Sequence, residues 1–511
     1  MYSCVKTLAL SGLIGKEIRV EADMSEGLPV FEMVGFLGGE VKEARERVRT
    51  ALKNSGVSLP PKRITVNLSP ADIKKSGTSY DLAVAVSLLK LLGKLPPESA
   101  DGMVVIGELG LSGEIHKVNG VLPMLIEAKS MGISSCMVPH DNIAEAMAVD
   151  GMGVIGVRSI EEMRSFFEGK ETECVRNARA DLNDMYEDTD YDVDFSEVNG
   201  QETCKRAMEI AAAGMHNILL IGPPGSGKTM LAKRLPTILP KPDTDECMEI
   251  TKIYSVAGLL KDGQGLIRTR PFVAPHHTIS AAAMAGGGAI PRPGECSLSH
   301  RGVLFLDELP EFSKSTLEIL RQPMEDKQVT IARAAASYTY PAGFLLCAAM
   351  NPCKCGYYPD REKCRCSDSD VQKYLGKISG PLLDRIDICA EASRMDYKDI
   401  SSKECGESSA VIRKRVEGAV MMQKERFKDS DIRFNTDIGV KDIDRYCHLG
   451  RKEEKLMREA FESIGLSARA YHKMIRVART IADLDGSEKI ECRHLSEAIG
   501  FRNIDRRYWN G

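Results

Sequence analysis

The amino-acid sequence predicts an α/β protein of about three domains, and three observations support this. The chain has 511 residues, and one domain usually takes roughly 150. Residues 1–170 alternate β-rich runs with helical patterns, and residues 198–394 do so again around a glycine-rich loop. Residues 395–511 are rich in helical patterns, of which the last is expected over Arg493–Ile499. Alternating strands and helices are typical of α/β domains, so we expect two of them followed by a helical region.

In the amino-terminal region, short runs of apolar and β-branched residues predict strands, and longer amphipathic or apolar runs predict helices. The expected strands are Ile64–Asn67, Met103–Ile106 and Cys136–Val138, and the expected helices are Val41–Asn54 and Leu82–Leu92.

Residues 171–197 are expected to form an acidic linker. Between Asp181 and Glu197 the chain has eight acidic residues, no lysine or arginine, and few apolar side chains. Such a segment buries too little apolar surface to fold alone. A negatively charged binding patch is the alternative interpretation.

Composition excludes several classes of protein. The chain has 69 basic and 73 acidic side chains, a net charge of -4, which argues against coating nucleic acid through bulk charge. Its fifteen cysteines, an odd number, do not suggest a disulfide framework. The amino terminus lacks a signal-peptide pattern, and no apolar run reaches the ~20 residues that cross a bilayer. We therefore expect a cytoplasmic protein without a membrane span.

The most specific motif is a phosphate-binding loop. An apolar strand, Ile218–Ile221, precedes the loop, and a helical run begins at Met230. Glycines allow successive N–H groups to turn toward phosphate oxygens, and the following helix adds its partial positive charge. Lys228 would reach the β- and γ-phosphates of ATP, and Thr229 would bind Mg²⁺. The expected ATP-binding residues are Gly222, Pro223, Pro224, Gly225, Ser226, Gly227, Lys228, Thr229 and Met230.

Two further apolar strands end in polar residues. Val303–Leu306 is followed by Asp307 and Glu308, and Phe344–Met350 is followed by Asn351. Buried parallel strands present such residues at the edge where ligands bind. Asp307 would hold Mg²⁺, and Glu308 would orient and deprotonate the attacking water. Asn351 would hold that water or contact the γ-phosphate, although a turn-forming role before Pro352 is the alternative.

These motifs resemble the AAA+ ATPases of the magnesium-chelatase-like group, and the whole chain is similar to the ComM/YifB type, which is associated with competence in bacteria. The resemblance implies an AAA+ core over 198–394 and a helical lid over 395–511. It rests on these segments: Arg270–Ser280, Gly302–Phe312, Ala349–Gly356, Ser379–Asp387 and Leu466–His472.

The resemblance also implies roles for three residues: Asn351 as sensor 1, Arg385 as an arginine finger offered to a neighbouring subunit, and Arg469 as sensor 2. A guanidinium stabilises the charge that spreads over a transferring phosphoryl group. ATP hydrolysis would then depend on assembly into a ring, expected to be a hexamer. Without the resemblance, an ion-paired surface residue is the favoured interpretation of Arg385, and Arg469 is interpreted as a basic surface residue.

Two insertions resemble the pore loops of related rings. Ser280–Gly294 contains three glycines, and Gln328–Ala342 resembles a hairpin before sensor 1. Arg292 and Arg333 are the candidates for contacting DNA phosphates. The adjacent His276 and His277 could suggest a metal site. Because adjacent residues in a strand point to opposite sides, a structural role is favoured.

Four cysteines, Cys353, Cys355, Cys364 and Cys366, lie within fourteen positions. A tetrahedral Zn²⁺ site takes four thiolates, so we expect structural zinc here. The Cys-x-Cys spacing is less common than Cys-x-x-Cys, and free thiols or redox chemistry are the alternatives.

Residues 1–170 resemble the Lon-type protease fold through the segments Gly77–Val84, Val104–Ile115 and Ile133–Pro139. In that family a lysine activates a serine. Here Ser79 occupies the serine position and Leu122 the lysine position. Because leucine cannot accept a proton, we expect a domain without protease activity.

The expected function is that of a ring-forming, ATP-driven DNA motor. The resemblance implies a helicase that promotes branch migration during recombination in natural transformation, with recombination proteins as candidate partners. A chelatase-type or chaperone-like ATPase that remodels a protein partner is the alternative.

Overall fold

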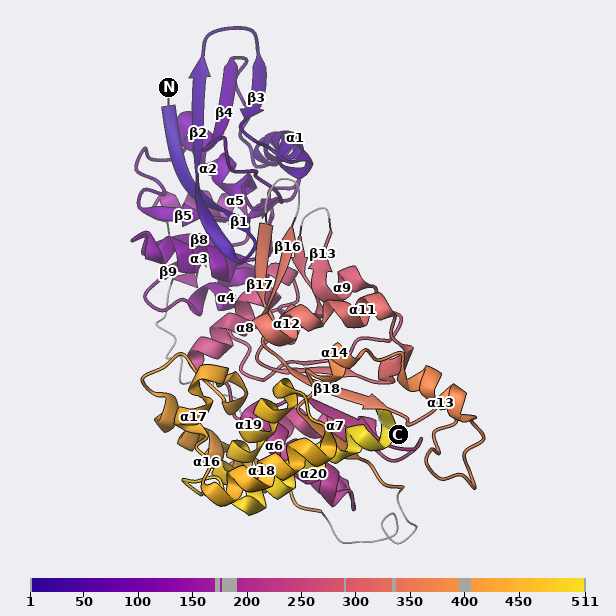
Figure 1. Ribbon diagram of the computed structural model, residues 1–511. Helices are drawn as coiled ribbons and strands as arrows, with labels where there is room; N and C mark the ends of the chain where they lie inside the picture. Colours follow the sequence, from indigo (N-terminus) through magenta and orange to yellow (C-terminus); the bar gives the residue numbers. More distant parts are fainter. Residues whose placement is uncertain are drawn as a thin grey trace.

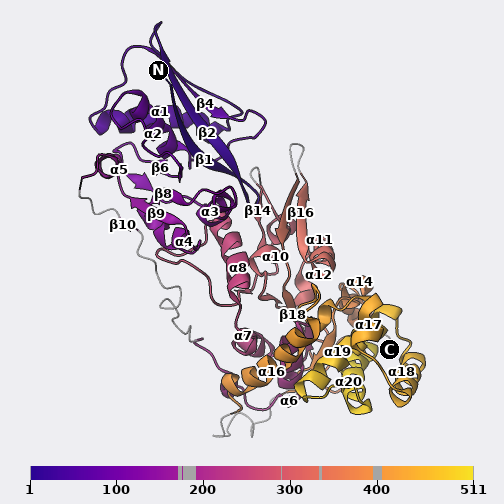
Figure 2. The ribbon, with the colours of Figure 1, turned by 90° about the vertical axis from the view of Figure 1, so that its left-hand side faces the viewer.

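The structure is a computed structural model that describes residues 2–170, 175–176, 191–288, 291–332, 337–394 and 406–509. Most of the expected acidic linker lies outside these residues. Figures 1 and 2 show an amino-terminal α/β part at one end, a second α/β part in the middle and a bundle of helices at the other end. The predicted fold class, α/β with a parallel sheet and a helical carboxyl-terminal region, is confirmed. None of the described helices is long and apolar enough to cross a membrane.

The amino-terminal part is built on an eight-stranded sheet with strand order β10-β9-β8-β5-β1-β2-β4-β3. The sheet is mixed. The pairs β1–β2, β2–β4 and β9–β10 are antiparallel, and the pairs β3–β4, β1–β5, β5–β8 and β8–β9 are parallel. The expected strands and helices agree with it within two residues. The strands of the sheet are β1 (Tyr2–Ser11), β2 (Ile14–Ser25), β3 (Val30–Val34), β4 (Arg63–Ser69), β5 (Met103–Val105), β8 (Ser135–Pro139), β9 (Gly153–Val157) and β10 (Val175–Arg176). A separate ribbon joins β6 (Glu108–Leu109) and β7 (Ile115–His116), and the helices are α1 (Gly39–Asn54), α2 (Asp81–Leu91), α3 (Val121–Ser130), α4 (Ile143–Met147) and α5 (Ile160–Phe167).

The central part is a five-stranded sheet, in the order β12-β15-β18-β11-β19, in which every neighbouring pair is parallel. Its central strands are wholly buried, as expected for a sheet covered on both faces. The strands are β11 (Ile218–Ile221), β12 (Phe272–Val273), β15 (Val303–Leu306), β18 (Leu345–Met350) and β19 (Ile388–Glu391). The helices around them are α6 (Glu202–Gly214), α7 (Lys228–Ile238), α8 (Thr244–Ala257), α9 (Ala281–Ala285), α10 (Glu295–Leu298), α11 (Lys314–Ile319), α12 (Arg321–Asp326), α13 (Asp368–Leu375) and α14 (Gly380–Leu383).

Two small hairpins project from the central part toward the amino-terminal part (Figure 2). They are β13 (Gly286–Gly287) with β14 (Arg292–Pro293), and β16 (Gln328–Ala332) with β17 (Ser337–Pro341). The two hairpins are in contact, since the Tyr340 hydroxyl donates to the Pro291 carbonyl at 2.8 Å.

The carboxyl-terminal helices pack against α6 and α7 of the central part, sharing one apolar core. They are α16 (Ser409–Phe427), α17 (Ile443–Tyr446), α18 (Arg451–Ile464), α19 (Ala468–Leu484) and α20 (Cys492–Trp509). The expectation that the last helix would end at Ile499 is wrong. The helix continues because Tyr508 and Trp509 at its end pack against the central part, a tertiary contact that local periodicity does not reveal.

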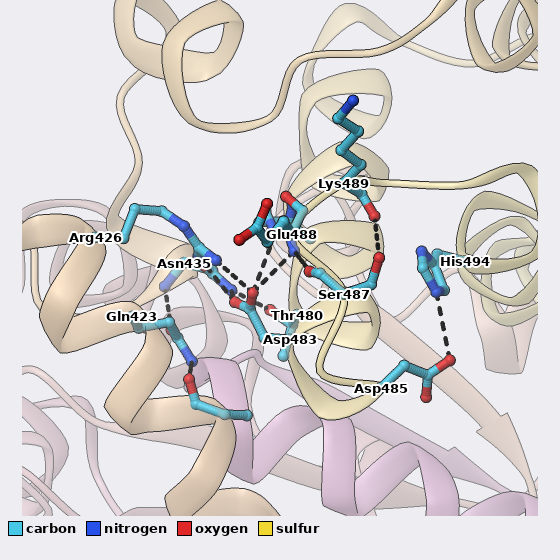
Figure 3. A network of polar contacts seen from close by, with 12 residues as sticks. Gln423, Arg426, Asn435, Thr480, Asp483, Asp485, Ser487, Glu488, Lys489 and His494 are labelled. Atoms are coloured by element: carbon cyan, nitrogen blue, oxygen red, sulfur yellow. Dashed lines mark hydrogen bonds and ion pairs between the residues drawn. The ribbon is translucent and has the colours of Figure 1, made fainter.

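A buried polar network holds these helices together (Figure 3). The Asp483 carboxylate, fully buried, accepts hydrogen bonds from the guanidinium groups of Arg426 and Arg479 and from the Asn435 amide. Asn435 also donates to the Thr480 hydroxyl, which contacts the ring of His216 at 2.8 Å. Since His216 directly follows α6, the network joins the carboxyl-terminal helices to the central part.

Asp483→Ala is expected to destabilise these helices by about 3–5 kcal/mol, because two guanidinium groups would lose a buried counter-charge. Trp509 is the only tryptophan and lies at the end of α20, so its fluorescence during urea unfolding reports this region. Glu425→Ala, which removes the exposed ion pair with Lys428, is the control and should cost less than about 1 kcal/mol. Equal effects of the two substitutions would contradict the importance of the network.

Candidate active site

The phosphate-binding loop connects β11 to the first turn of α7 in the central sheet. Gly227 caps the helix in the left-handed conformation, with φ of +83°, which glycine adopts without steric cost. Helix α7 begins at Lys228, so its free N–H groups lie beside the loop. The loop therefore has the backbone shape that surrounds phosphate oxygens.

Lys228 lies inside this loop and contacts the predicted sensor. Its side chain is largely buried, and its Nζ donates to the carbonyls of Gly222 and Pro223, both at 2.8 Å, and to Asn351 Oδ1 at 3.2 Å. Burial lowers the pKa of the Lys228 ammonium, and the charge of Asp307 opposes this shift. The lysine and the sensor amide can therefore act on the same phosphoryl group.

Thr229 and Asp307 form the adjacent pair that would hold Mg²⁺. The Thr229 hydroxyl in α7 donates to Asp307 Oδ2 at 2.7 Å, although the two residues are 78 positions apart. A hydroxyl and a carboxylate are ligands that suit this hard cation. Bound there, Mg²⁺ would neutralise charge on the β- and γ-phosphates.

Glu308 has a strained backbone. Its φ is +52°, unusual for a residue with a side chain, and its N–H donates to Asp307 Oδ1 at 2.9 Å. The Glu308 side chain is 59% exposed. A carboxylate held this way can accept a proton from a water molecule in the site.

His277 is a neighbour of Glu308 that the sequence analysis missed. His277 Nδ1 lies 3.8 Å from Glu308 Oε2, and its ring packs edge-on against Phe312. The expectation that His276 and His277 point to opposite sides is wrong: the chain leaves the strand after Val273, and the two rings lie 4.1 Å apart. The pairing of β12 with β15 explains why His277 lies near Glu308, since it brings the segment after Val273 to the same sheet edge as Glu308.

Gln201 is a second residue that the sequence did not reveal. Its side-chain amide donates to the carbonyls of Ser226 in the loop and of Ser393 beyond β19, at 3.1 and 2.6 Å. Gln201 precedes α6 with φ of +59°. It therefore ties the phosphate-binding loop to the end of the neighbouring strand.

Arg385 and Arg469 lie at the opposite edge of the central sheet. Arg385 precedes β19, whereas the loop follows β11, and the two strands are parallel with Ile218 opposite Ile388. Four strand residues separate the two edges by about 13 Å. Arg385 and Arg469 both contact Glu325 Oε1, at 2.7 and 3.3 Å.

The two arginines line a cavity of about 720 Å³ between the central part and the carboxyl-terminal helices. The Nε atoms of Arg385 and Arg476 are buried there and have no hydrogen-bond partner within the described ranges. Several acidic side chains also line the cavity, Glu325 among them. The other basic residues that line it are Arg301, Lys327, Arg433 and Lys473.

Of the two arginines suggested to contact DNA, Arg292 lies exposed in β14. Arg333 lies outside the described residues. The hairpins approach the turn between β1 and β2, where a Cβ on Gly12 would be 3.4 Å from the Tyr338 ring. The structure thus brings the two insertions together next to the amino-terminal part.

The four cysteines of the predicted metal site lie together in the loop between β18 and α13. Their Sγ atoms all lie within 4.8 Å of one another. Cys353 Sγ lies 3.4 Å from that of Cys355 and 3.7 Å from that of Cys364. These distances bring the four thiols close enough to share one ion.

The position matched to the protease lysine holds a buried leucine. Leu122 is fully buried among apolar side chains at the start of α3. Its N–H donates to Glu145 at 2.8 Å, and Glu145 also accepts a hydrogen bond from Ser255 of α8. Burial raises the pKa of Glu145. This position therefore contributes to docking between the amino-terminal and central parts.

His277→Ala is expected to lower kcat for ATP hydrolysis five- to tenfold with little change in KM. Loss of the imidazole 3.8 Å from the Glu308 carboxylate costs on the order of 1 kcal/mol. Steady-state ATPase kinetics check this, with His276→Ala as the matched control because His276 contacts Thr278 instead. An equal decrease of kcat in both variants would show that the two histidines affect hydrolysis only by stabilising the fold.

Comparison with known proteins agrees with this geometry. Three family models match the chain: magnesium chelatase, subunit ChlI, over residues 194–400; subunit ChlI of Mg-chelatase over 20–142; and the ChlI carboxyl-terminal region over 406–502. The amino-terminal part also resembles Lon protease of Mycolicibacterium smegmatis, with 29% identity over 141 residues, or 26% of this chain and 18% of that protease.

Two relatives match almost the whole chain. The uncharacterized protein YifB of Escherichia coli (strain K12) is 41% identical over 513 residues, covering 99% of this chain and 97% of YifB. The competence protein ComM of Haemophilus influenzae is 38% identical over 508 residues, covering 98% of this chain and 97% of ComM. The chain therefore belongs to the magnesium-chelatase-like AAA+ ATPases of the ComM/YifB type.

Proposed function

We propose that this AAA+ ATPase assembles into a ring, expected to be hexameric, and uses ATP hydrolysis to drive DNA branch migration during recombination. One observation carries the proposal: the phosphate-binding machinery and the arginines Arg385 and Arg469 lie at opposite edges of one parallel sheet. Arginines so placed are suited to contact a nucleotide that another copy of the chain binds.

The cavity around these arginines supports this arrangement. Buried guanidinium groups normally find acceptors, and the Nε atoms of Arg385 and Arg476 have none within the described ranges. Phosphate oxygens of a nucleotide on a neighbouring copy would be suitable acceptors for these groups, and the buried side chains would turn outward to reach them.

In hydrolysis, residues of two neighbouring chains would have separate roles. Lys228 would bind the β- and γ-phosphates, and Asn351 would position the γ-phosphate or the attacking water. Glu308 would accept the proton of that water. Arg385 from the neighbouring chain would stabilise the charge that develops on the phosphoryl oxygens, an effect of about 10³ to 10⁵ in rate where measured.

DNA as the partner is supported by similarity to a competence protein and by the two adjacent hairpins with the exposed Arg292. This chain would promote branch migration during recombination in natural transformation. The alternative partner is a protein, because magnesium-chelatase subunits share the central part.

We also propose that the four clustered cysteines bind structural Zn²⁺. Sγ distances of 3.4 to 3.7 Å among Cys353, Cys355 and Cys364 support this, because they are too long for a disulfide and close to the edges of a tetrahedral thiolate site. Cys366 Sγ lies within 4.8 Å of the other three.

A mixing experiment tests whether hydrolysis is shared between copies. Glu308→Gln and Arg385→Ala chains should each bind ATP and hydrolyse almost none. In a random equimolar mixture, activity should recover to about a quarter of the wild-type rate, since one junction in four joins an intact base to an intact arginine. No recovery in rings that contain both variants would mean that Arg385 does not act across the interface.

A branch-migration assay on joint DNA molecules with ATP tests the choice of partner. We expect ATP-dependent movement of the junction, DNA-stimulated ATPase activity, and DNA binding that weakens as salt increases. Glu308→Gln protein, which should bind DNA without moving it, is the control. ATPase activity that does not respond to single-stranded, duplex or forked DNA would favour a protein partner.

A further inference from the structure

We infer that the four-cysteine loop, when it binds Zn²⁺, packs against Pro224 and thereby fixes the position of the phosphate-binding loop. This inference rests on the proposed zinc site and extends it by giving the metal a role in ATP binding.

The sulfur geometry fits a tetrahedral ion. Zn–S bonds of about 2.3 Å place the sulfur atoms of a regular tetrahedron about 3.8 Å apart. The distances among Cys353, Cys355 and Cys364 are 3.4, 3.6 and 3.7 Å. Lys354 and Arg365 alternate with the cysteines and would offset the negative charge of four thiolates. The Tyr358 N–H also donates to Cys353 Sγ at 3.4 Å, as is usual in the surroundings of metal ligands.

The loop needs an ion to hold its shape. Residues 351–367, between β18 and α13, contain no helix or strand. A segment of this length has few backbone hydrogen bonds to offset its ordering entropy. Binding of a metal by four side chains supplies that free energy, as in other small metal-dependent folds.

The loop touches the nucleotide site at two points. It begins with Asn351, whose amide contacts Lys228. At Gly356 the chain has φ of +84°, and a Cβ there would lie 2.3 Å from Pro224 Cδ. No side chain fits between the cysteine loop and the phosphate-binding loop, so a shift of one displaces the other.

On its other side the cysteine loop contacts the last helix. The ring of Tyr358 lies 6.1 Å from that of Tyr508. In α13, which follows the loop, the Leu375 carbonyl accepts a hydrogen bond from the indole N–H of Trp509 at 3.3 Å. The metal site therefore lies between the phosphate-binding loop and the end of α20.

Gly356→Ala tests the contact while leaving all four cysteines in place. We expect purified protein to keep about one Zn per chain by elemental analysis, and its Kd for ATP to rise about tenfold because Pro224 must move. The matched control is Gly93→Ala, which adds a methyl group at a similar φ of +64° with nothing within 4 Å. Unchanged ATP affinity in Gly356→Ala, with zinc retained, would overturn the inference.

Loss of the metal should have the same effect. Cys355→Ser with Cys366→Ser changes the two half-buried ligands and is expected to lose zinc and weaken ATP binding about tenfold or more, while circular dichroism stays unchanged. Cys4→Ser is the control outside the cluster. If wild-type protein purified under reducing conditions contains no zinc, the metal site is refuted. Normal zinc and ATP binding without DNA movement would instead count against the proposed function alone.

Discussion

The parallel direction of all five strands in the central sheet determines where the residues of the candidate site lie. It gathers the carboxyl ends of β11, β15 and β18 at one edge, where Lys228, Asp307 and Asn351 meet. The same direction takes Arg385 to the other edge, where it pairs with Glu325. A chain with this topology keeps its own Glu308 away from its own Arg385, and the proposed assembly would bring Arg385 of a neighbouring copy to that site.

The nucleotide site is connected to each neighbouring region through direct contacts. Gln201 joins the loop to the end of β19, and Gly356 joins it to the cysteine loop. Helix α8 of the central part carries Ser255, which binds the buried Glu145 of the amino-terminal part. Packed side chains therefore connect the phosphate-binding loop to the carboxyl-terminal helices and to the Lon-like amino-terminal part.

Much of this site could be predicted from sequence because its parts are local. The loop, Asp307, Glu308 and Asn351 each follow a short apolar strand, and parallel strands bring such ends together. The contacts of His277, Gln201 and Glu325 could not be predicted in this way, since their partners are 25 to 192 positions away in the chain. Helix α20 was predicted too short because its end is held by tertiary packing of Tyr508 and Trp509.

The most direct test of the central claim is ATPase rate per chain as a function of chain concentration, with assembly followed by sedimentation. If the active site is completed by a second copy, the rate per chain should be near zero for monomers and rise steeply as rings form. A rate per chain that stays constant from monomer to ring would show that one chain hydrolyses ATP unaided and would contradict the account.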